Sequence, residues 1–311
     1  MKASALVVAS EAGISAAAAL LASGGVVALP TETVYGLGAS ALDPAACARI
    51  FEAKDRPLSD PLIVHLPGID WFDVLADASP VARELAARFW PGPLTLVLPR
   101  KDIVPDIVTA GQETVAVRMS AHPVFQAVLQ AFGKPLAAPS ANRFGRISPT
   151  SAADVLAELG DRIPLILDGG PCLHGVESTI VLVRDGELHI LRHGPITAGE
   201  LAAFGPVRAG VAGISAPGSL ASHYAPRTPL VIGDPTPAPR TGLLAWSASG
   251  DGFECVEFLS RTQDLREAAS NLYAGMRRLD GAGLDRILAE PVPEHGLGAA
   301  IMERLRKAAA R

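Results

Sequence analysis

Short apolar runs that alternate with helical segments are the feature that most constrains the fold of this chain. Residues 26–29 and 62–66 are largely apolar runs of strand length, and a proline follows each of them. Residues 81–89, in contrast, place Val81, Leu85 and Phe89 four positions apart, which is the spacing of one helix face. Interleaved strands and helices predict an α/β fold with a mixed sheet.

The same patterns divide the 311 residues into two parts. In the first part we expect helices at residues 14–22, 45–54, 81–89, 124–132 and 154–159, and strands at residues 26–29, 62–66, 94–98, 114–119, 136–138, 163–167, 178–183 and 188–192. Residues 205–229 are rich in Gly, Ala, Ser and Pro without periodicity, which is typical of a linker. A second strand and helix pattern then runs through residues 230–232, 243–245, 264–279, 286–288 and 299–307. We therefore expect a domain at residues 1–204, a linker at 205–229 and a smaller domain at 230–311.

Composition excludes several classes of protein. The net charge is −5 and no basic run is long, which argues against a nucleic-acid-binding module. Cys47, Cys172 and Cys255 are far apart, so neither a disulfide framework nor a zinc site is expected. No signal peptide is evident, and the apolar residues 14–22 fall short of the roughly 20 that span a membrane. We expect a cytoplasmic protein with no membrane contact and no stable nucleic-acid binding.

Polar side chains crowd into the segment that follows the strand at residues 26–29. Thr31, Glu32, Thr33 and Tyr35 occupy five positions, and the glycines after them let backbone approach a ligand. A polar turn that caps a helix needs one such residue, not four. The segment therefore indicates a binding site.

A pair of cations suggests what could bind. Lys54 and Arg56 are two positions apart, and Pro57 favours an extended chain in which both point to one side. With no obvious carboxylate partner, they would suit a polyanion such as a triphosphate. The alternative is a solvated charged loop.

Further polar residues follow other predicted strands. Ser140 and Asn142 offer a hydroxyl and an amide to one side, while Ser148 could cap the next helix or bind phosphate there. Arg118 and Arg192 each end a strand, where α/β proteins bind ligands. No GxxxxGK[ST] or strand-linked GxGxxG motif occurs, so any ATP would need an unusual cationic cavity.

Together these segments resemble the YrdC/Sua5 family in order and spacing. The motifs are Pro-Thr-Glu-Thr-Val-Tyr-Gly-Leu at 30–37, Lys-x-Arg-Pro at 54–57, Trp-Pro-Gly-Pro-Leu-Thr at 90–95, Ala-Pro-Ser-Ala-Asn at 138–142 and Gly-Val-Glu-Ser-Thr at 175–179. Residues 216–226 are similar to the linker of the two-domain Sua5 type. Two departures are His193, where the family often has proline, and Ser222, where lysine is frequent.

The resemblance implies a fold and an activity. The fold is a YrdC-like twisted mixed sheet with flanking helices, plus a smaller Rossmann-like C-terminal Sua5 domain. The activity is synthesis of threonylcarbamoyl-AMP and pyrophosphate from L-threonine, bicarbonate and ATP, with Mg²⁺. A downstream tRNA threonylcarbamoyltransferase complex would then modify A37 of tRNAs that read ANN codons.

The resemblance also assigns site residues, with no protein metal ligand. The catalytic tetrad would be Lys54, Arg56, Ser140 and Asn142. Threonine would contact Thr31, His65, Arg118, Ser140 and Ser178. ATP would contact Lys54, Leu58, Thr114, Asn142, Ser148, Arg192, His223 and Tyr224.

Two alternatives stay open at this point. One is a carbamoyl-adenylate-forming carbamoyltransferase that shares the YrdC-like domain. The other is an RNA-binding protein that uses the cationic cavity, although the acidic net charge disfavours it.

Overall fold

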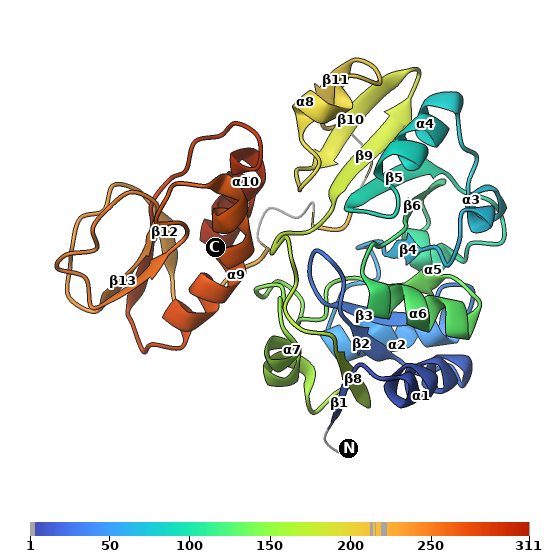
Figure 1. The fold of residues 1–311 in the computed structure, drawn as a ribbon, viewed down its shortest axis with the longest axis horizontal. Helices are drawn as coiled ribbons and strands as arrows, with labels where there is room; N and C mark the ends of the chain where they lie inside the picture. The colour runs from blue at the N-terminus through green and yellow to red at the C-terminus, as the bar shows by residue number, and fades with distance from the viewer. Residues whose placement is uncertain (1–3, 212–213, 215, 219–222, 311) are drawn as a thin grey trace.

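The computed structural model describes residues 4–211, 214, 216–218 and 223–310, and it contains two parts. The larger part surrounds an eleven-stranded sheet, and a smaller part with a four-stranded sheet stands beside it (Figure 1). Within the described residues, no helix is long and apolar enough to cross a membrane.

The large sheet is mixed, as predicted. Its strand order is β1-β8-β2-β3-β7-β4-β6-β5-β9-β10-β11. The strands are β1 Ala5–Val8, β2 Val27–Leu29, β3 Gly36–Ser40, β4 Ile63–His65, β5 Leu94–Pro99, β6 Thr114–Arg118, β7 Leu136–Ala137, β8 Leu165–Asp168, β9 Thr179–Arg184, β10 Glu187–Arg192 and β11 Val207–Ala209. The sheet contains parallel pairs such as β4 with β6 and antiparallel pairs such as β5 with β6.

Helices cover both faces of this sheet, which explains why the strand sequences are continuously apolar. The helices are α1 Glu11–Ala22, α2 Pro44–Lys54, α3 Asp70–Leu75, α4 Pro80–Phe89, α5 Asp106–Thr109, α6 Pro123–Phe132, α7 Ala152–Leu159 and α8 Ala198–Leu201. Val27 and Leu29 pack in the core under α1 and α6, whereas Val26 and Ala28 pack in the core under α2, α4 and α7. Alternate residues along this strand therefore pack into two different cores, one on each face of the sheet.

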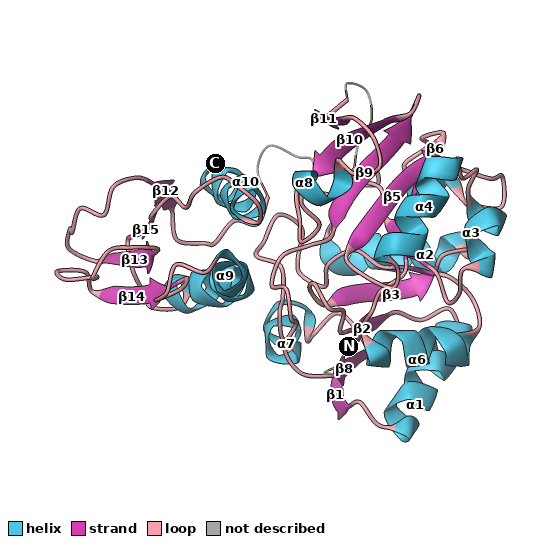
Figure 2. Ribbon diagram, turned by 45° about the horizontal axis from the view of Figure 1, so that its top comes forward, coloured by secondary structure: helices cyan, strands magenta, loops and turns pink. Residues whose placement is uncertain are grey.

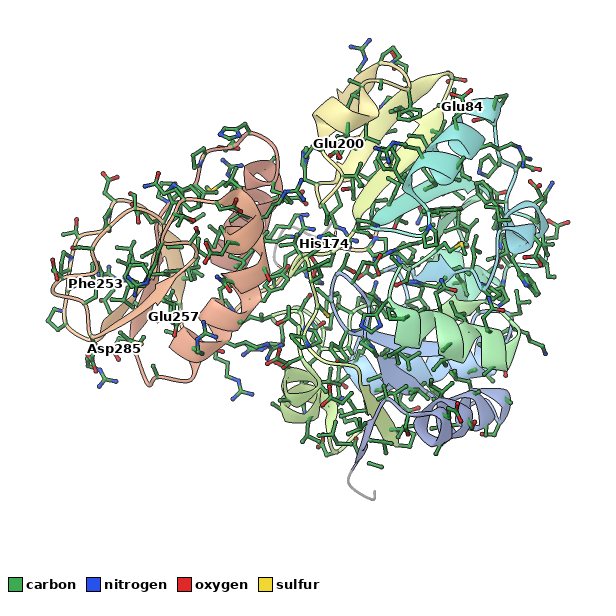
Figure 3. The ribbon with its side chains drawn as sticks, viewed as in Figure 1. Glu84, His174, Glu200, Phe253, Glu257 and Asp285 are labelled. Carbon is green, nitrogen blue, oxygen red and sulfur yellow. The ribbon has the colours of Figure 1, made fainter. Side chains whose placement is uncertain are left out.

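The smaller part is a parallel sheet with helices on one side. Its strands β12 Leu230–Ile232, β13 Thr241–Ala245, β14 Cys255–Phe258 and β15 Arg286–Ala289 lie in the order β12-β15-β13-β14. Helices α9 Leu265–Asp280 and α10 Gly298–Ala309 lie between this sheet and the larger part (Figure 2). Figure 3 shows His174 at the junction of the two parts, with Phe253 and Asp285 on the far side of the smaller one.

One apolar cluster joins the two parts. Val34, Ile147 and Val176 of the larger part are buried together with residues of α9 and α10 such as Leu272 and Ile301. The smaller part is therefore docked through a continuous core, and its helices reach the region of the polar motifs.

Some elements lie outside the sequence predictions. Strand β1 was not predicted, although Ala5–Val8 is apolar throughout, and its Leu6 and Val8 are exposed at 47% and 73%. The glycines after the polar segment form strand β3 rather than a loop. Strand β11 pairs with β10 although its residues fall in the region expected to be a linker. Strand β14 and the short helices α3, α5 and α8 were also not predicted.

Candidate active site

The candidate site lies on one face of the large sheet, rather than at the strand ends alone. Alternate residues of β4, β5, β6 and β9 pack under the helices, namely Val64, Leu96, Val117 and Val181. Their neighbours Ile63, Val97, Ala116 and Ile180 form a cluster on the opposite face with Ala216. His65 and Arg118 follow Ile63 and Ala116 by two positions, so the pleat places them on this opposite face.

Polar side chains and the chain after β10 surround a pocket on that face. The residues that line it are Thr31, Thr33, Val34, Gly36, Arg56, Ile63, His65, Arg118, Ala138, Pro139, Ser140, Glu177, Arg192, Pro217, Gly218, His223 and Tyr224. Three arginines and one carboxylate make the lining cationic, in a chain whose net charge is −5.

The polar segment after β2 is a tight turn that carries Glu32 to this face. The Thr31 hydroxyl accepts from the backbone N–H groups of Thr33 and Val34, at 3.0 and 3.2 Å, and donates to the Val34 carbonyl at 2.6 Å. The hydroxyls therefore shape the turn as well as line the pocket.

Arg118 is fixed by a buried ion pair. Its Nη2 lies 2.6 Å from Oε1 of Glu32, and its Nη1 donates to the Thr33 hydroxyl at 3.1 Å. Burial raises the pKa of Glu32, but Arg118 and the Ser120 hydroxyl outweigh burial and hold that pKa at about 2. Arg118 thus presents a rigid guanidinium to the pocket.

His65 lies beside Arg118 as a neutral imidazole. Burial and the nearby Arg118 charge lower its pKa to about 3. Its Nδ1 has no hydrogen-bond partner among the described residues. A buried neutral imidazole with an open nitrogen can accept a proton from, or donate one to, a polar ligand group.

The structure corrects the expected geometry of Lys54 and Arg56. Helix α2 continues through Lys54 and the chain turns at Asp55, which has a φ of 53°, so the two cations are not on one extended strand. The expected lack of a carboxylate partner is also wrong, because Asp60 lies 3.0 Å from Arg56.

The two cations have different positions. Lys54 is buried behind the pocket wall, where its ammonium donates to the carbonyls of Ser140 and Asn142. Burial, and then the Arg56 charge, lower its pKa well below the ordinary value. Arg56 lines the pocket itself. Lys54 therefore shapes the loop that carries Ser140, whereas Arg56 can meet a ligand.

Arg192 joins three segments of the site. Its Nε donates to the Ser178 carbonyl, its Nη2 to the Ser178 hydroxyl and its Nη1 to the Pro217 carbonyl, each at 3.0 Å. Ser178 is also bonded to Thr95 at 2.8 Å and does not itself line the pocket. Ser178 thus holds Arg192 in place.

Several predicted residues do not reach the pocket lining. Asn142 donates to the carbonyls of Arg143 and Arg146, and Ser148 is fully buried behind the wall. Ser151, not Ser148, caps α7.

The other two lie further away. Leu58 is 61% exposed. Thr114 starts β6, and Arg118 ends it four residues later, roughly 13 Å along the strand. The structure therefore does not bring Leu58 and Thr114 into the pocket.

The sequence matches two family models that together span most of the chain. Residues 19–194 match the Sua5/YciO/YrdC model, which is described as telomere recombination. Residues 196–310 match a second model, described as the C-terminal domain of threonylcarbamoyl-AMP synthase. The chain belongs to the Sua5/YciO/YrdC family. The family resemblance and the fold predicted from the sequence are both confirmed.

Named relatives align with both domains of this Sua5-type chain. The threonylcarbamoyl-AMP synthase of Pyrococcus abyssi is 41% identical over 95% of this chain and 93% of its own length. That of Bacillus subtilis is 42% identical over 95% of this chain and 92% of its own length. The crystal structure of P. abyssi Sua5 complexed with L-threonine matches with a TM-score of 0.90 at 38% identity, and covers 98% of both chains.

Four described residues of the stretch predicted to be a linker line the pocket, namely Pro217, Gly218, His223 and Tyr224. The rings of His223 and Tyr224 are in edge contact, with centroids 4.1 Å apart. A Cβ on Gly218 would lie 2.3 Å from the Tyr224 hydroxyl oxygen, so only glycine permits this approach. Ser222, the second departure noted in the sequence, lies outside the described residues.

Sequence reasoning missed Glu177 as a pocket residue. Its carboxylate lines the pocket and bonds to Arg304 and Tyr273, both from the smaller domain. The only sequence signal was its place in the motif at 175–179, since nothing links it to a residue 127 positions later.

Proposed function

We propose that this chain is an L-threonylcarbamoyladenylate synthase, which forms threonylcarbamoyl-AMP and pyrophosphate from L-threonine, bicarbonate and ATP. The observation that supports it most is the buried cationic pocket, which is lined by Arg118 and neutral His65 together with Arg56 and Arg192. Relatives that carry this name match both domains.

Arg118 and His65 form the threonine end of the pocket in this proposal. The guanidinium suits the amino-acid carboxylate, because arginine binds carboxylates through paired donors. The free Nδ1 of His65 suits the threonine hydroxyl or amine. Thr31 and Ser140 complete this end, and Ser178 contributes by holding Arg192.

Arg56 and Arg192 form the phosphate end. Both residues line the pocket, and Lys54 holds the loop of Ser140 and Asn142 behind the pocket wall. No group of three His, Cys, Asp or Glu side chains among the described residues could hold a metal. In this proposal Mg²⁺ enters the pocket with the nucleotide, as MgATP.

The reaction needs no protein nucleophile. Bicarbonate takes up a proton and loses water to give CO₂, to which the threonine amine adds with loss of a proton. The carbamate oxygen then attacks the α-phosphorus while pyrophosphate leaves. The enzyme has to align two anions and neutralise their charge, which fixed arginines do. Leu58, Thr114, Asn142 and Ser148 would contribute to ATP binding only if the structure rearranges around the nucleotide.

The product would serve a downstream tRNA threonylcarbamoyltransferase complex in the cytoplasm. That complex would transfer the threonylcarbamoyl group to A37 of tRNAs that read ANN codons. This chain would then not bind tRNA stably, which fits its acidic net charge.

The two-domain architecture favours the synthase over the carbamoyltransferase alternative. The match at residues 196–310 is to a domain described for threonylcarbamoyl-AMP synthase. We propose a catalytic domain at residues 1–204, a linker at 205–229 and a C-terminal domain at 230–311, with β11 an extension of the catalytic sheet.

A pyrophosphate-release assay tests this function. We expect release only when ATP, L-threonine and bicarbonate are all present. Activity that survives omission of threonine would contradict the proposal. Arg56→Ala should abolish most activity, and full activity in that variant would contradict the site assignment.

A further inference from the structure

Arg304 of the C-terminal domain is fully buried, although it lies on a helix at the domain surface. Its exposed fraction is 0%, and its Nε donates to Oε2 of Glu177 at 2.9 Å. Tyr273 of α9 donates to both oxygens of the same carboxylate, at 3.1 and 2.9 Å. Two helices of one domain thus hold a pocket carboxylate of the other.

The neighbouring residues of α10 hold the other segments of the same wall. Glu303 accepts a hydrogen bond from the backbone N–H of His193 at 2.9 Å, directly after Arg192. Lys307 donates to the Gly218 carbonyl in the linker and pairs with Glu303 at 2.7 Å. Positions 303, 304 and 307 share one helix face. One face of α10 therefore contacts the Glu177 loop, the Arg192 loop and the linker.

The position of Glu177 also affects Arg192 at the phosphate end of the pocket. The next residue, Ser178, accepts two hydrogen bonds from Arg192. The Arg304 guanidinium also lies 5.3 Å from the centre of the Tyr224 ring. A shift of the Glu177 carboxylate would thus displace Arg192, and a shift of Arg304 would displace the linker tyrosine.

The energetics also favour a geometric role for this pair. Burying two charges costs free energy that their attraction often only offsets, so a buried ion pair is weak evidence of stabilisation. Arg306, two positions along the same helix, pairs with Glu294 at the surface, where both side chains are more than half exposed. Arg304, which is buried, and Arg306, which is exposed, can therefore be compared as matched positions of one helix.

We propose that Arg304 is a positioning residue of the active site, which acts through Glu177 to hold the wall formed by Ser178, Arg192 and the linker. The pocket is then complete only when α10 is docked. This inference rests on the proposed function, because its readout is the synthase reaction.

The test compares Arg304→Met with Arg306→Met in the full chain. We expect Arg304→Met to lower kcat/KM for ATP by roughly 10- to 100-fold, because small misplacements of a positioned group have effects of that size. Arg306→Met should stay within about twofold, since exposed ion pairs contribute little. Arg304→Lys should recover part of the loss. Loss of the Arg304 charge also leaves a buried Glu177, so a new ionisation should enter the pH profile of kcat/KM for Arg304→Met alone.

A double-mutant cycle separates positioning from simple unfolding. Glu177→Gln keeps the shape of the side chain, and Tyr273→Phe removes only one hydroxyl. If Arg304 acts through Glu177, then the Glu177→Gln/Arg304→Met variant should lose no more activity than the worse single variant. Tyr273→Phe should show a smaller loss in the same direction.

Two results would overturn the inference. One is equal activity of Arg304→Met and Arg306→Met, and the other is multiplied losses in the double variant. A wild-type chain with no threonine-dependent pyrophosphate release would instead contradict the proposed function, so the two failures can be told apart.

Discussion

Two buried carboxylate–arginine pairs lie in the walls of one pocket, and they differ in what holds them. Glu32 and Arg118 both belong to the catalytic domain, where they follow strand β2 and end strand β6. Glu177 and Arg304 come from two domains. In both pairs burial raises the pKa of the carboxyl group, and the arginine with its neighbours outweighs burial and holds that pKa at about 2. The wall that Glu32 and Arg118 hold, called the first wall below, forms together with the sheet. The wall that Glu177 and Arg304 hold, called the second wall, is complete only when α10 docks.

The largest expected effect comes from breaking the first pair. Arg118→Met leaves Glu32 buried and unpaired, so we expect the free energy of unfolding to fall by about 3–5 kcal/mol. Threonine affinity should fall roughly 30-fold or more, since loss of one partner of a buried charge pair costs about 2–5 kcal/mol. Urea unfolding and calorimetric titration with threonine measure the two effects.

The control for this variant is Arg83→Met. Arg83 pairs with Asp73 at the surface, where both side chains are more than half exposed, so its loss should cost less than about 1 kcal/mol. Equal stability of the two variants would mean that Glu32 finds another partner, and that the first wall is not fixed by Arg118.

Acid should act on the two walls in two stages. His65 beside the first pair and His223 in the linker have an ordinary pKa of 6.5 and a pKa of about 3 in the folded chain. Between these values the unfolded chain binds more protons, so stability is complete above pH 6.5 and falls with decreasing pH, by about 1.4 kcal/mol per unit for each histidine. The carboxylates, with a depressed pKa, lose their contribution later, from about pH 4.5 to 2.

Unfolding free energies between pH 7 and pH 3 check this order. His65→Asn and His223→Asn should each flatten the first stage, while His295→Asn, at an exposed position, should leave it unchanged. A decline that starts only below pH 4.5 in the wild-type chain would contradict the buried neutral state of both histidines.

A smaller effect is expected from the linker that closes the second wall. Gly218 has a φ of +82° and its missing Cβ would meet the Tyr224 hydroxyl at 2.3 Å, so Gly218→Ala should displace the tyrosine. Gly210→Ala is a matched control, because Gly210 also has a positive φ, at +52°, but has open space around it. We expect backbone strain of about 1–3 kcal/mol in each. Only Gly218→Ala should also raise KM for ATP, and equal KM values would contradict the packing role of the glycine.

The sequence predicted the first wall better than the second. Arg118 of the first wall was found because it ends an apolar strand, and period-two alternation then places it on the open face. In the second wall the same signal found only Arg192. The end of α2 at Lys54 was predicted, but the left-handed turn at Asp55 was not, because Pro57 favours an extended chain only at the residue before it. The role of Glu177 in the pocket could not be predicted, because its partners Tyr273 and Arg304 lie in another domain. Patterns in a single sequence describe local structure only.

The smallest expected effect is the change in substrate selectivity when the second wall is disturbed, because selectivity should depend on the first wall alone. A site that hydrogen-bonds the threonine hydroxyl rejects valine strongly, since its polar groups would be left unpaired. Serine lacks only a methyl group, so its discrimination should be on the order of 1–3 kcal/mol. His65 and Arg118 belong to the catalytic domain, so Arg304→Met should slow both amino acids while the threonine-to-serine ratio of kcat/KM changes by less than about twofold. If valine supported pyrophosphate release better than serine, then the pocket end next to Arg118 would not bind the hydroxyl. If the threonine-to-serine ratio of kcat/KM shifted in Arg304→Met, then the second wall would also affect threonine binding. The first and second walls would then not be independent.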